Sequence, residues 1–237
     1  MKCILAASAL CTIAVAPALA DEWGYTGAHD PSHWSGTCAT GAEQSPIDLD
    51  GEIEAEIEGP ALFWGTAEAD AVRNAGHALQ VDFAEGAGMV LDGVEYGLLQ
   101  FHIHTPSEHT LAGEAFPMEV HFVHAAEDGR LAVLGVFFAE GVAHPELDAL
   151  IAAMPATAGI SDWAGDLDLD RFLPAETEVL RYAGSLTTPP CSEIVSWSVY
   201  DTPVEASAEQ IAALQALFGA NARPVQPINR RFLLIAD

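Results

Sequence analysis

The sequence predicts a single domain made mainly of β-strands, with a few short helices at its periphery. Five short segments alternate apolar and polar residues as half-buried strands do, and Gly, Pro or charged residues bound them. They are residues 77–83, 98–104, 118–124, 130–138 and 193–200. No repeat or long linker divides the 237 residues, which fit one domain with a sizeable core. Length alone also allows two small domains.

The first twenty residues predict a secretory signal peptide. A positively charged start precedes an apolar middle, and small residues precede an expected cut between Ala20 and Asp21. A membrane anchor is one alternative, but the apolar run is short for a span and ends at Pro17. A lipoprotein signal at Cys11 is a weaker alternative, because the residue before it is large. We therefore expect residues 21–237 to form the mature, periplasmic or secreted domain.

Two cysteines, Cys38 and Cys191, remain after removal of this segment. In an oxidising compartment an even pair favours a disulfide. The bridge would close a loop of about 150 residues, for which the chain-entropy model gives at most about 5 kcal/mol of stabilisation. Two unpaired thiols in the core are the alternative.

Side chains alternate faces along a strand, so Gln100, His102 and His104 share one face of segment 98–104. The opposite face is apolar and is expected to pack on the core. It consists of Leu99, Phe101 and Ile103. One face of this strand therefore presents two imidazoles side by side.

A second predicted strand, 118–124, places Glu119, His121 and Val123 on one face. His121 follows His104 by 17 positions, which is enough for a hairpin that brings it beside the first two histidines. Three neutral imidazoles with an open fourth position form a catalytic zinc arrangement, because zinc favours tetrahedral coordination. These strands therefore predict a metal site, with buried structural histidines as the alternative.

Other nearby residues leave alternatives open. His124 points away from His121, and His109 lies in a loop where it could bind metal or hydrogen-bond in the core. The first two histidines followed by Glu108 also match the first metal motif of the cupins, in which Glu108 would be a ligand. The second cupin motif expects a glycine that the segment from Pro117 to His121 lacks.

Two helices are predicted in the second half of the chain, at residues 144–154 and 207–218. In the second, Ser207 precedes Gln210 by three positions, which is a capping-box pattern at a helix N-terminus.

The charge balance is strongly acidic, with 35 acidic residues against eight basic ones and a formal net charge of −27. Removal of Lys2 with the leader leaves seven arginines against the same 35 acidic residues, hence −28. Such a surface repels nucleic acid and anionic lipid, so we expect no nucleic-acid partner and no membrane insertion of the mature chain. A saline environment would screen this self-repulsion. Compositional bias is the alternative explanation.

Eight motifs occur along the mature chain in the order known from one enzyme family. They are WGYTG (23–27) followed by HW at 33, QSPIDL (44–49), NAGHALQV (74–81), QFHIH (100–104) with SEHT (107–110), EVHFVH (119–124), LAVLGVFF (131–138), GSLTTPPCSE (184–193) and RPVQPINRR (223–231). Through them the chain resembles the α-class carbonic anhydrases over nearly all of its mature length. The cupins predict only the first metal motif.

The resemblance implies zinc (Zn²⁺) on His102, His104 and His121, the same three that strand alternation brings together. It leaves His109 and His124 as structural residues. It implies reversible hydration of carbon dioxide to bicarbonate and a proton through zinc-bound hydroxide. The implied fold is a single domain around a large twisted, mostly antiparallel central sheet with short peripheral helices.

The resemblance also assigns roles around the metal. Zinc lowers the pKa of its bound water to about 7 in carbonic anhydrases themselves. Gln100 and Glu119 match residues that hydrogen-bond the outer nitrogens of ligand histidines. Thr187 matches a residue that donates its proton to Glu108 and so orients the hydroxide. Thr188 matches a substrate-contacting threonine.

Five apolar residues match the family's hydrophobic wall for carbon dioxide, although residues of this kind are more often plain core. They are Val123, Val133, Leu186, Val195 and Trp197.

His77 matches the family's proton shuttle, because histidine titrates near neutrality. Tyr25 matches a tyrosine of the zinc-solvent network. Many animal members have asparagine where this chain has Ala75 and Gln80, so the departures concern the proton path.

The resemblance supports a Cys38–Cys191 bridge, seen in bacterial members, and allows a homodimer. A recognition domain that has lost a ligand histidine and a zinc store are competing functions. A recognition domain would lack one of the three ligand histidines, and this chain has all three. A zinc store would need neither Thr187 nor His77, and this chain has both.

Overall fold

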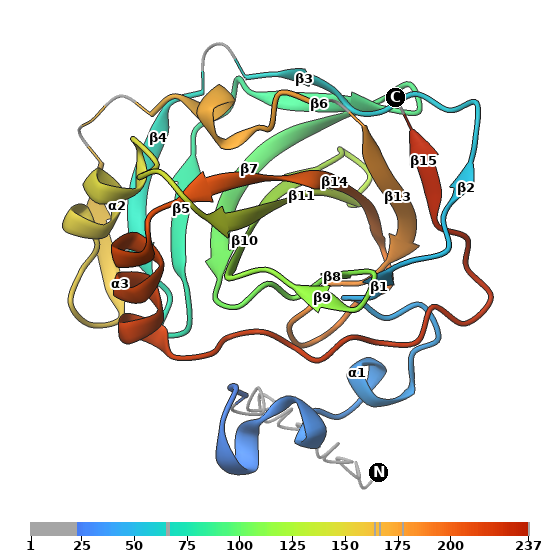
Figure 1. Ribbon diagram of the computed structural model, residues 1–237, viewed down its shortest axis with the longest axis horizontal. Helices are drawn as coiled ribbons and strands as arrows, with labels where there is room; N and C mark the ends of the chain where they lie inside the picture. The colour runs from blue at the N-terminus through green and yellow to red at the C-terminus, as the bar shows by residue number, and fades with distance from the viewer. Residues whose placement is uncertain (1–22, 65–66, 164, 166, 177, 237) are drawn as a thin grey trace, which may run out of the picture.

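The computed structural model describes residues 23–64, 67–163, 165, 167–176 and 178–236 (Figure 1). The predicted signal peptide, residues 1–20, lies outside the described residues.

Strands dominate the described chain, as predicted. They are β1 (Asp48–Leu49), β2 (Ile53–Glu54), β3 (Ala61–Phe63), β4 (Ala69–Asn74), β5 (Leu79–Phe83), β6 (Gly88–Leu91), β7 (Val94–His104), β8 (Thr110–Leu111), β9 (Glu114–Ala115), β10 (Met118–Ala125), β11 (Leu131–Glu140), β12 (Gly159–Asp162), β13 (Val179–Gly184), β14 (Val195–Ala206) and β15 (Leu234–Ala236). The helices are α1 (Thr37–Thr40), α2 (Leu147–Ala153), α3 (Ala208–Phe218) and the 3-10 turns η1 (Gly27–His29), η2 (Pro31–His33) and η3 (Leu169–Phe172).

One large sheet organises the molecule. Its path runs β12-β4-β5-β7-β10-β11-β14-β13-β15-β2, with β3 joined through β6 to β7. Most neighbours are antiparallel, while β11 with β14 and β15 with β2 are parallel. A smaller sheet pairs β1, β8 and β9. Figure 1 shows α2 and α3 side by side at one edge of the large sheet. The predicted β architecture with peripheral helices is confirmed.

All five predicted strands and both predicted helices are present, with small shifts at their ends. The second helix begins as predicted, because Ser207 and Gln210 form the complete capping box of α3. The first begins at Leu147 rather than at 144. The backbone N–H and C=O of His144 bind the side chain of Gln210, at 2.8 and 2.9 Å, and the C=O also accepts from Leu147 N at 3.4 Å, so His144 lies in the turn before the helix.

Leu99 is a correction to the predicted core face of β7. Its side chain is 49% exposed, whereas Leu98, Phe101 and Ile103 are buried. The pairing with β10 skips Leu99, because Val123 faces Gln100 and the next residue faces Leu98. This β-bulge moves Leu98 into the core in place of Leu99.

Both faces of β10 are buried, which fixes the strand that carries His121. On one face Phe122 packs with Phe101 and Phe172, at ring-centroid distances of 5.2 and 6.0 Å. On the other, Val123 belongs to a second apolar cluster. Burying each large apolar side chain contributes about 1.5–3 kcal/mol to the free energy of folding. Turning either face to solvent would lose several such contributions.

A disulfide joins Cys38 of α1 to Cys191, with 5.0 Å between the Cα atoms and a sequence separation of 153. The predicted bridge is confirmed. It ties α1 to the turn that follows Thr187 and Thr188. Among the described residues, no helix is both long and apolar enough to cross a membrane.

Candidate metal centre

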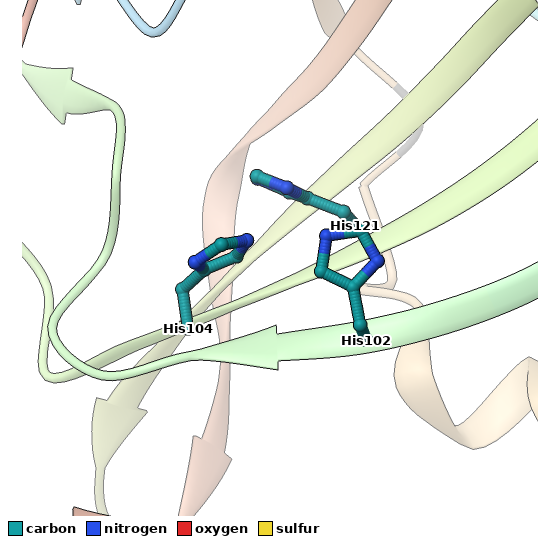
Figure 2. Close-up of side chains that lie close together, drawn as sticks. All are labelled: His102, His104 and His121. Atoms are coloured by element: carbon teal, nitrogen blue, oxygen red, sulfur yellow. The ribbon is translucent and has the colours of Figure 1, made fainter. Parts of the chain in front are cut away.

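The three predicted histidine ligands lie together on neighbouring strands. β7 and β10 are antiparallel, and their register places His121 opposite His102 and Glu119 opposite His104. One nitrogen from each of the three imidazoles lies within 4.8 Å of the others. Figure 2 shows the three side chains gathered on one side of these strands. Alternation along two paired strands is therefore sufficient to build the cluster.

Hydrogen bonds fix which nitrogen of each β7 histidine is left for a metal. His102 Nδ1 lies 2.9 Å from Gln100 Oε1, and His104 Nδ1 lies 2.7 Å from the backbone carbonyl oxygen of Asn221. Both partners are acceptors, so each Nδ1 carries the proton and donates it. Nε2 of each ring then presents a lone pair.

His121 is oriented from the other side, by Glu119. Its Nε2 lies 2.9 Å from Glu119 Oε1, and Nδ1 is left for a metal. The backbone N–H groups of Glu108 and His109 donate to Glu119 Oε2, and His109 Nδ1 lies 2.7 Å from Oε1. Gly135 of β11 leaves room for this carboxylate, since a Cβ there would lie 3.1 Å from Oε1.

The buried groups of the site differ in their charge states. Burial lowers the pKa of His102 and of His104, so both are neutral near pH 7. Burial also acts to lower the pKa of His121, but Glu119 and Glu108 outweigh burial and raise that pKa, so a metal ion at this ring would displace a proton. Burial alone would raise the pKa of the Glu119 carboxyl, but its interactions with His109 and His121 outweigh burial and hold that pKa well below its ordinary range. His104 Nε2 is buried without a hydrogen-bond partner. Three imidazole nitrogens, one of them otherwise unsatisfied, fit a zinc ion.

Glu108 does not make the hydrogen bond that was expected from Thr187. Its Oε1 accepts from the backbone N–H of Arg223 at 2.8 Å, while its buried Oε2 has no hydrogen-bond partner. Oε2 instead faces the imidazoles, 3.4 Å from His104 Nε2 and 3.9 Å from His121 Nδ1. Thr187 is buried in the chain segment before Cys191, and the backbone oxygen of Thr188 accepts from the backbone N–H of Cys191.

Asn221 is a site residue that the sequence did not reveal. Besides the bond to His104, its Oδ1 accepts from Thr105 N at 2.7 Å, and its Nδ2 donates to the backbone oxygens of Ile103 and His77. It is 1% exposed. One amide thus joins the end of β7 to the His77 loop. The only available signal was its place two positions before the RPVQPINRR motif.

The residues expected on the proton path cluster near the N-terminal segment. The ring of His77 lies 4.6 Å from that of Trp23 and 6.2 Å from that of Tyr25. Burial lowers the pKa of His77 and raises that of Tyr25, whose hydroxyl has no hydrogen-bond partner. Gln80 pairs with His102 across β5 and β7 but turns its amide to Asp82. The backbone N–H of Ala75 donates to Ala78 O, and a backbone hydrogen bond from Ala75 to His77 opposes part of the lowering of the His77 pKa.

The five apolar residues expected beside the metal belong to one cluster. One of them is Trp197 of β14, whose ring lies 4.8 Å from that of His121. The others are Val123, Val133, Leu186 and Val195.

The two remaining histidines of the motif do not join the cluster of three. His109 bridges Glu119 and the hydroxyl of Tyr182, at 2.7 and 2.6 Å. His109, Glu119 and His121 also bring possible ligand atoms together, but hydrogen bonding between His109 and Glu119 accounts for that proximity. His124 lies on the opposite face of β10, with its ring stacked 6.5 Å from Trp64.

Comparison with known proteins places this site in a family. Residues 29–235 match the model of the eukaryotic-type carbonic anhydrases. A carbonic anhydrase of Pectobacterium atrosepticum is 38% identical over 221 residues, 90% of each chain. One from Nostoc sp. is 38% identical over 95% of this chain and 90% of its own. The α-carbonic anhydrase of Thermovibrio ammonificans, solved with the inhibitor sulfanilamide, superposes with a TM-score of 0.86 at 40% identity, covering 90% of this chain and 98% of that one.

Proposed function

The chain belongs to the eukaryotic-type (α) carbonic anhydrase family, and we propose that it hydrates carbon dioxide at a zinc ion bound by His102, His104 and His121. Membership makes it a carbonic anhydrase, and carbon dioxide with bicarbonate is the substrate pair that fits. The observation that carries the zinc proposal is the convergence of three imidazoles, each with its outer nitrogen turned to an oxygen acceptor.

Zinc, when bound, supplies a Lewis acid that makes water a nucleophile at neutral pH. The chain's own part is orientation. Gln100, Glu119 and the carbonyl of Asn221 each lie against an outer imidazole nitrogen and so fix the three rings. Outer partners of this kind are worth about 10- to 100-fold in metal affinity.

The apolar cluster around Trp197 supplies the place for carbon dioxide, which has no charge to bind. Val123 and Val133 line the same cluster as Leu186. This apolar wall would keep bulk water away from carbon dioxide beside a bound metal. Thr188, which follows Thr187, is assigned the substrate contact in this proposal.

Thr187 and Glu108 orient the nucleophile in this proposal. Glu108 is fixed at one oxygen by Arg223, and its second oxygen faces the imidazole nitrogens without a hydrogen-bond partner. A carboxylate oxygen without a proton only accepts hydrogen bonds, so this oxygen can accept one from a hydroxyl and set that hydroxyl's direction. Thr187 is the hydroxyl that the family resemblance assigns.

Release of the product proton is assigned to His77, with Tyr25 lining its path. His77 is half-buried against Trp23, and its pKa is lowered by burial, which favours rapid loss of the proton to solvent. Export to the periplasm or beyond is also part of the proposal. It is supported by the disulfide, which persists in oxidising compartments.

The zinc proposal is tested by metal analysis of the purified chain after dialysis. Wild type should carry about one zinc per chain. His121→Ala should carry almost none, because two imidazoles are left. His124→Asn is the matched control, since it lies three positions on in β10 and faces the other way, and it should retain zinc. Retention of zinc by His121→Ala would refute the ligand assignment.

The shuttle is tested by hydration kinetics in weak buffer. His77→Ala should lower kcat by at least about tenfold and leave kcat/KM unchanged, because proton release follows the conversion of carbon dioxide. Added imidazole should restore kcat. His33→Ala replaces an exposed histidine, so it is the control and should have no effect. A wild-type kcat in His77→Ala would remove His77 from the mechanism.

A further inference from the structure

A second cavity, of about 480 Å³, lies beside β13 and β15. Its volume is within the range of small-molecule sites, which is about 300–1,000 Å³. None of the described residues that line it is a histidine, so it is separate from the three proposed zinc ligands. Its charged lining consists of three arginines and two carboxylates: Arg181, Arg230, Arg231, Glu43 and Asp92.

The concentration of arginine in this cavity is unusual for so acidic a chain. Residues 21–237 contain seven arginines, no lysine and 35 acidic residues. Three of the seven arginines line this one cavity, and two carboxylates accompany them, so the local formal charge is 3 − 2 = +1. A local charge of this sign attracts anions, and a single excess charge suits a monoanion better than a dianion such as phosphate.

Arg181 carries a hydrogen-bond donor that the protein leaves unused. Its Nη1 and Nη2 donate to the two carboxylate oxygens of Asp92, at 3.1 and 2.7 Å, and Nη1 also donates to the backbone oxygen of Glu58 at 2.9 Å. The side chain of Arg181 is only 10% exposed, yet its buried Nε has no hydrogen-bond partner. A guanidinium N–H is a donor only, so this group requires an acceptor.

A second unpartnered polar atom lies next to Arg181 in the sheet. Ser198 of β14 is directly opposite Arg181 in the antiparallel register, so the two side chains share a face. The hydroxyl oxygen of Ser198 is also buried without a hydrogen-bond partner. Buried polar atoms are nearly always hydrogen-bonded, so two neighbouring unpartnered ones indicate a place for a further polar group.

Arg231 gives the cavity a fixed positive charge. Its guanidinium lies over the ring of Tyr182, 5.4 Å from the ring centroid. It also donates, at 2.9 to 3.0 Å, to the backbone oxygens of Gln44, Ala183, Pro227 and Ile228. These contacts are to neutral groups, so they hold the guanidinium in place without neutralising it.

The rest of the wall is mainly apolar and includes an exposed aromatic ring. Phe232 is 67% exposed, and the exposed Arg230 lies two positions before it. Ile57 and Leu234 line the same cavity, and Leu234 is opposite Arg181 in the register of β13 with β15. An apolar ligand surface placed here would remove the Phe232 ring from water, which is favourable.

We propose that this cavity binds a monocarboxylate with an apolar body. The carboxylate lies at the arginines, because the planar donor fork of a guanidinium matches the two oxygens of a carboxylate. The apolar body lies against Phe232, Ile57 and Leu234. This site is additional to the proposed hydration of carbon dioxide and does not depend on it.

The proposal is tested on the purified zinc-containing chain with cyclohexanecarboxylate as the probe. Two further probes each lack one of its parts: cyclohexanemethanol has no charge, and acetate has no ring. Cyclohexanecarboxylate should bind at least about tenfold more tightly than either, because hydrogen bonds to a charged group and apolar contact both contribute. Dissociation constants come from NMR titration of the backbone amides.

The same titration locates the probe. Tyr182 and Trp197 belong both to the lining of this cavity and to the apolar cluster near the metal, so the position must be measured directly. The amide signals of Ala183 and Phe232 should shift, and those of Thr187 and Asn221 should not. Shifts of Thr187 and Asn221 alone would place the carboxylate at the metal and overturn the proposal.

A pair of variants tests the charge. Arg230→Gln should weaken binding of cyclohexanecarboxylate by about threefold or more and leave binding of cyclohexanemethanol unchanged. Arg130→Gln is the matched control, because it removes the same charge from an exposed arginine paired with Asp128, outside the cavity. Equal weakening by both variants would mean that only the overall charge matters. That result, equal affinity for cyclohexanemethanol, or no binding of cyclohexanecarboxylate in the millimolar range would overturn the proposal.

Discussion

His124 is a buried neutral imidazole, and its titration should make folding stability depend on pH. It lies on β10 opposite the metal face and is 0% exposed. Its Nδ1 donates to the backbone oxygen of Phe122 at 3.0 Å, while Nε2 has no hydrogen-bond partner. Burial lowers the pKa of His124 to about 4. Protonation in the folded state would bury a charge beside Trp64, and backbone hydrogen bonding to Phe122 and Ala132 offsets only part of that cost.

The size of the effect follows from the difference between folded and unfolded pKa. An unfolded histidine has a pKa of about 6.5, so below that pH the unfolded state binds more protons and stability falls with pH. The contribution of His124 is fully present above about pH 6.5 and is lost as the pH falls toward 4. Between pH 7 and pH 5 the loss from this one residue amounts to about 2 kcal/mol, and below pH 4 it approaches about 3 kcal/mol.

The assay is urea unfolding of metal-free wild type and His124→Asn at pH 7 and pH 5. Asparagine can keep the donor to Phe122 but does not titrate. The variant should be less stable at pH 7, because the smaller side chain leaves a cavity, yet it should lose about 2 kcal/mol less than wild type on going to pH 5. The other titrating groups are shared and cancel. Equal pH dependence in the two proteins would refute the assignment of His124 as a buried neutral residue.

Three further perturbations test other parts of the structure. Glu119→Gln places an amide against His109 and His121, so zinc affinity should fall about 10- to 100-fold, measured by competition with a chelating dye. Unchanged zinc affinity would show that Glu119 does not orient His121. Replacing Cys38 and Cys191 together by alanine should lower the free energy of unfolding by up to about 5 kcal/mol, and a loss below about 1 kcal/mol would count against loop closure as the cause. With a net charge of −27, the chain should melt at a higher temperature in molar salt than in dilute buffer; a flat salt dependence would mean that charge repulsion does not limit its stability.

The ligand cluster was predictable because its cause is local. A period of two along β7 and β10 decides which side chains share a face, and the hydrophobic pattern decides which face is buried. The same reasoning placed His124 on the face opposite His121. It was wrong for Leu99, since a bulge depends on how β7 pairs with β10 and leaves no mark in the alternation of β7 alone.

The supporting contacts were not predictable, because they join residues far apart in the chain. Asn221 binds His104 across 117 positions, and Tyr182 binds His109 across 73. No periodicity links such pairs. The family resemblance supplied Thr187 and Glu108 but also suggested a hydrogen bond between them that this structure lacks, because Glu108 Oε2 turns toward the imidazoles.

The most direct test of the account is stopped-flow carbon dioxide hydration by the purified mature chain, with zinc analysis of the same sample. The account predicts hydration far above the uncatalysed rate, with about one zinc per chain and activity that falls in proportion as zinc is removed. Stoichiometric zinc at the three histidines with hydration at the uncatalysed rate would contradict it.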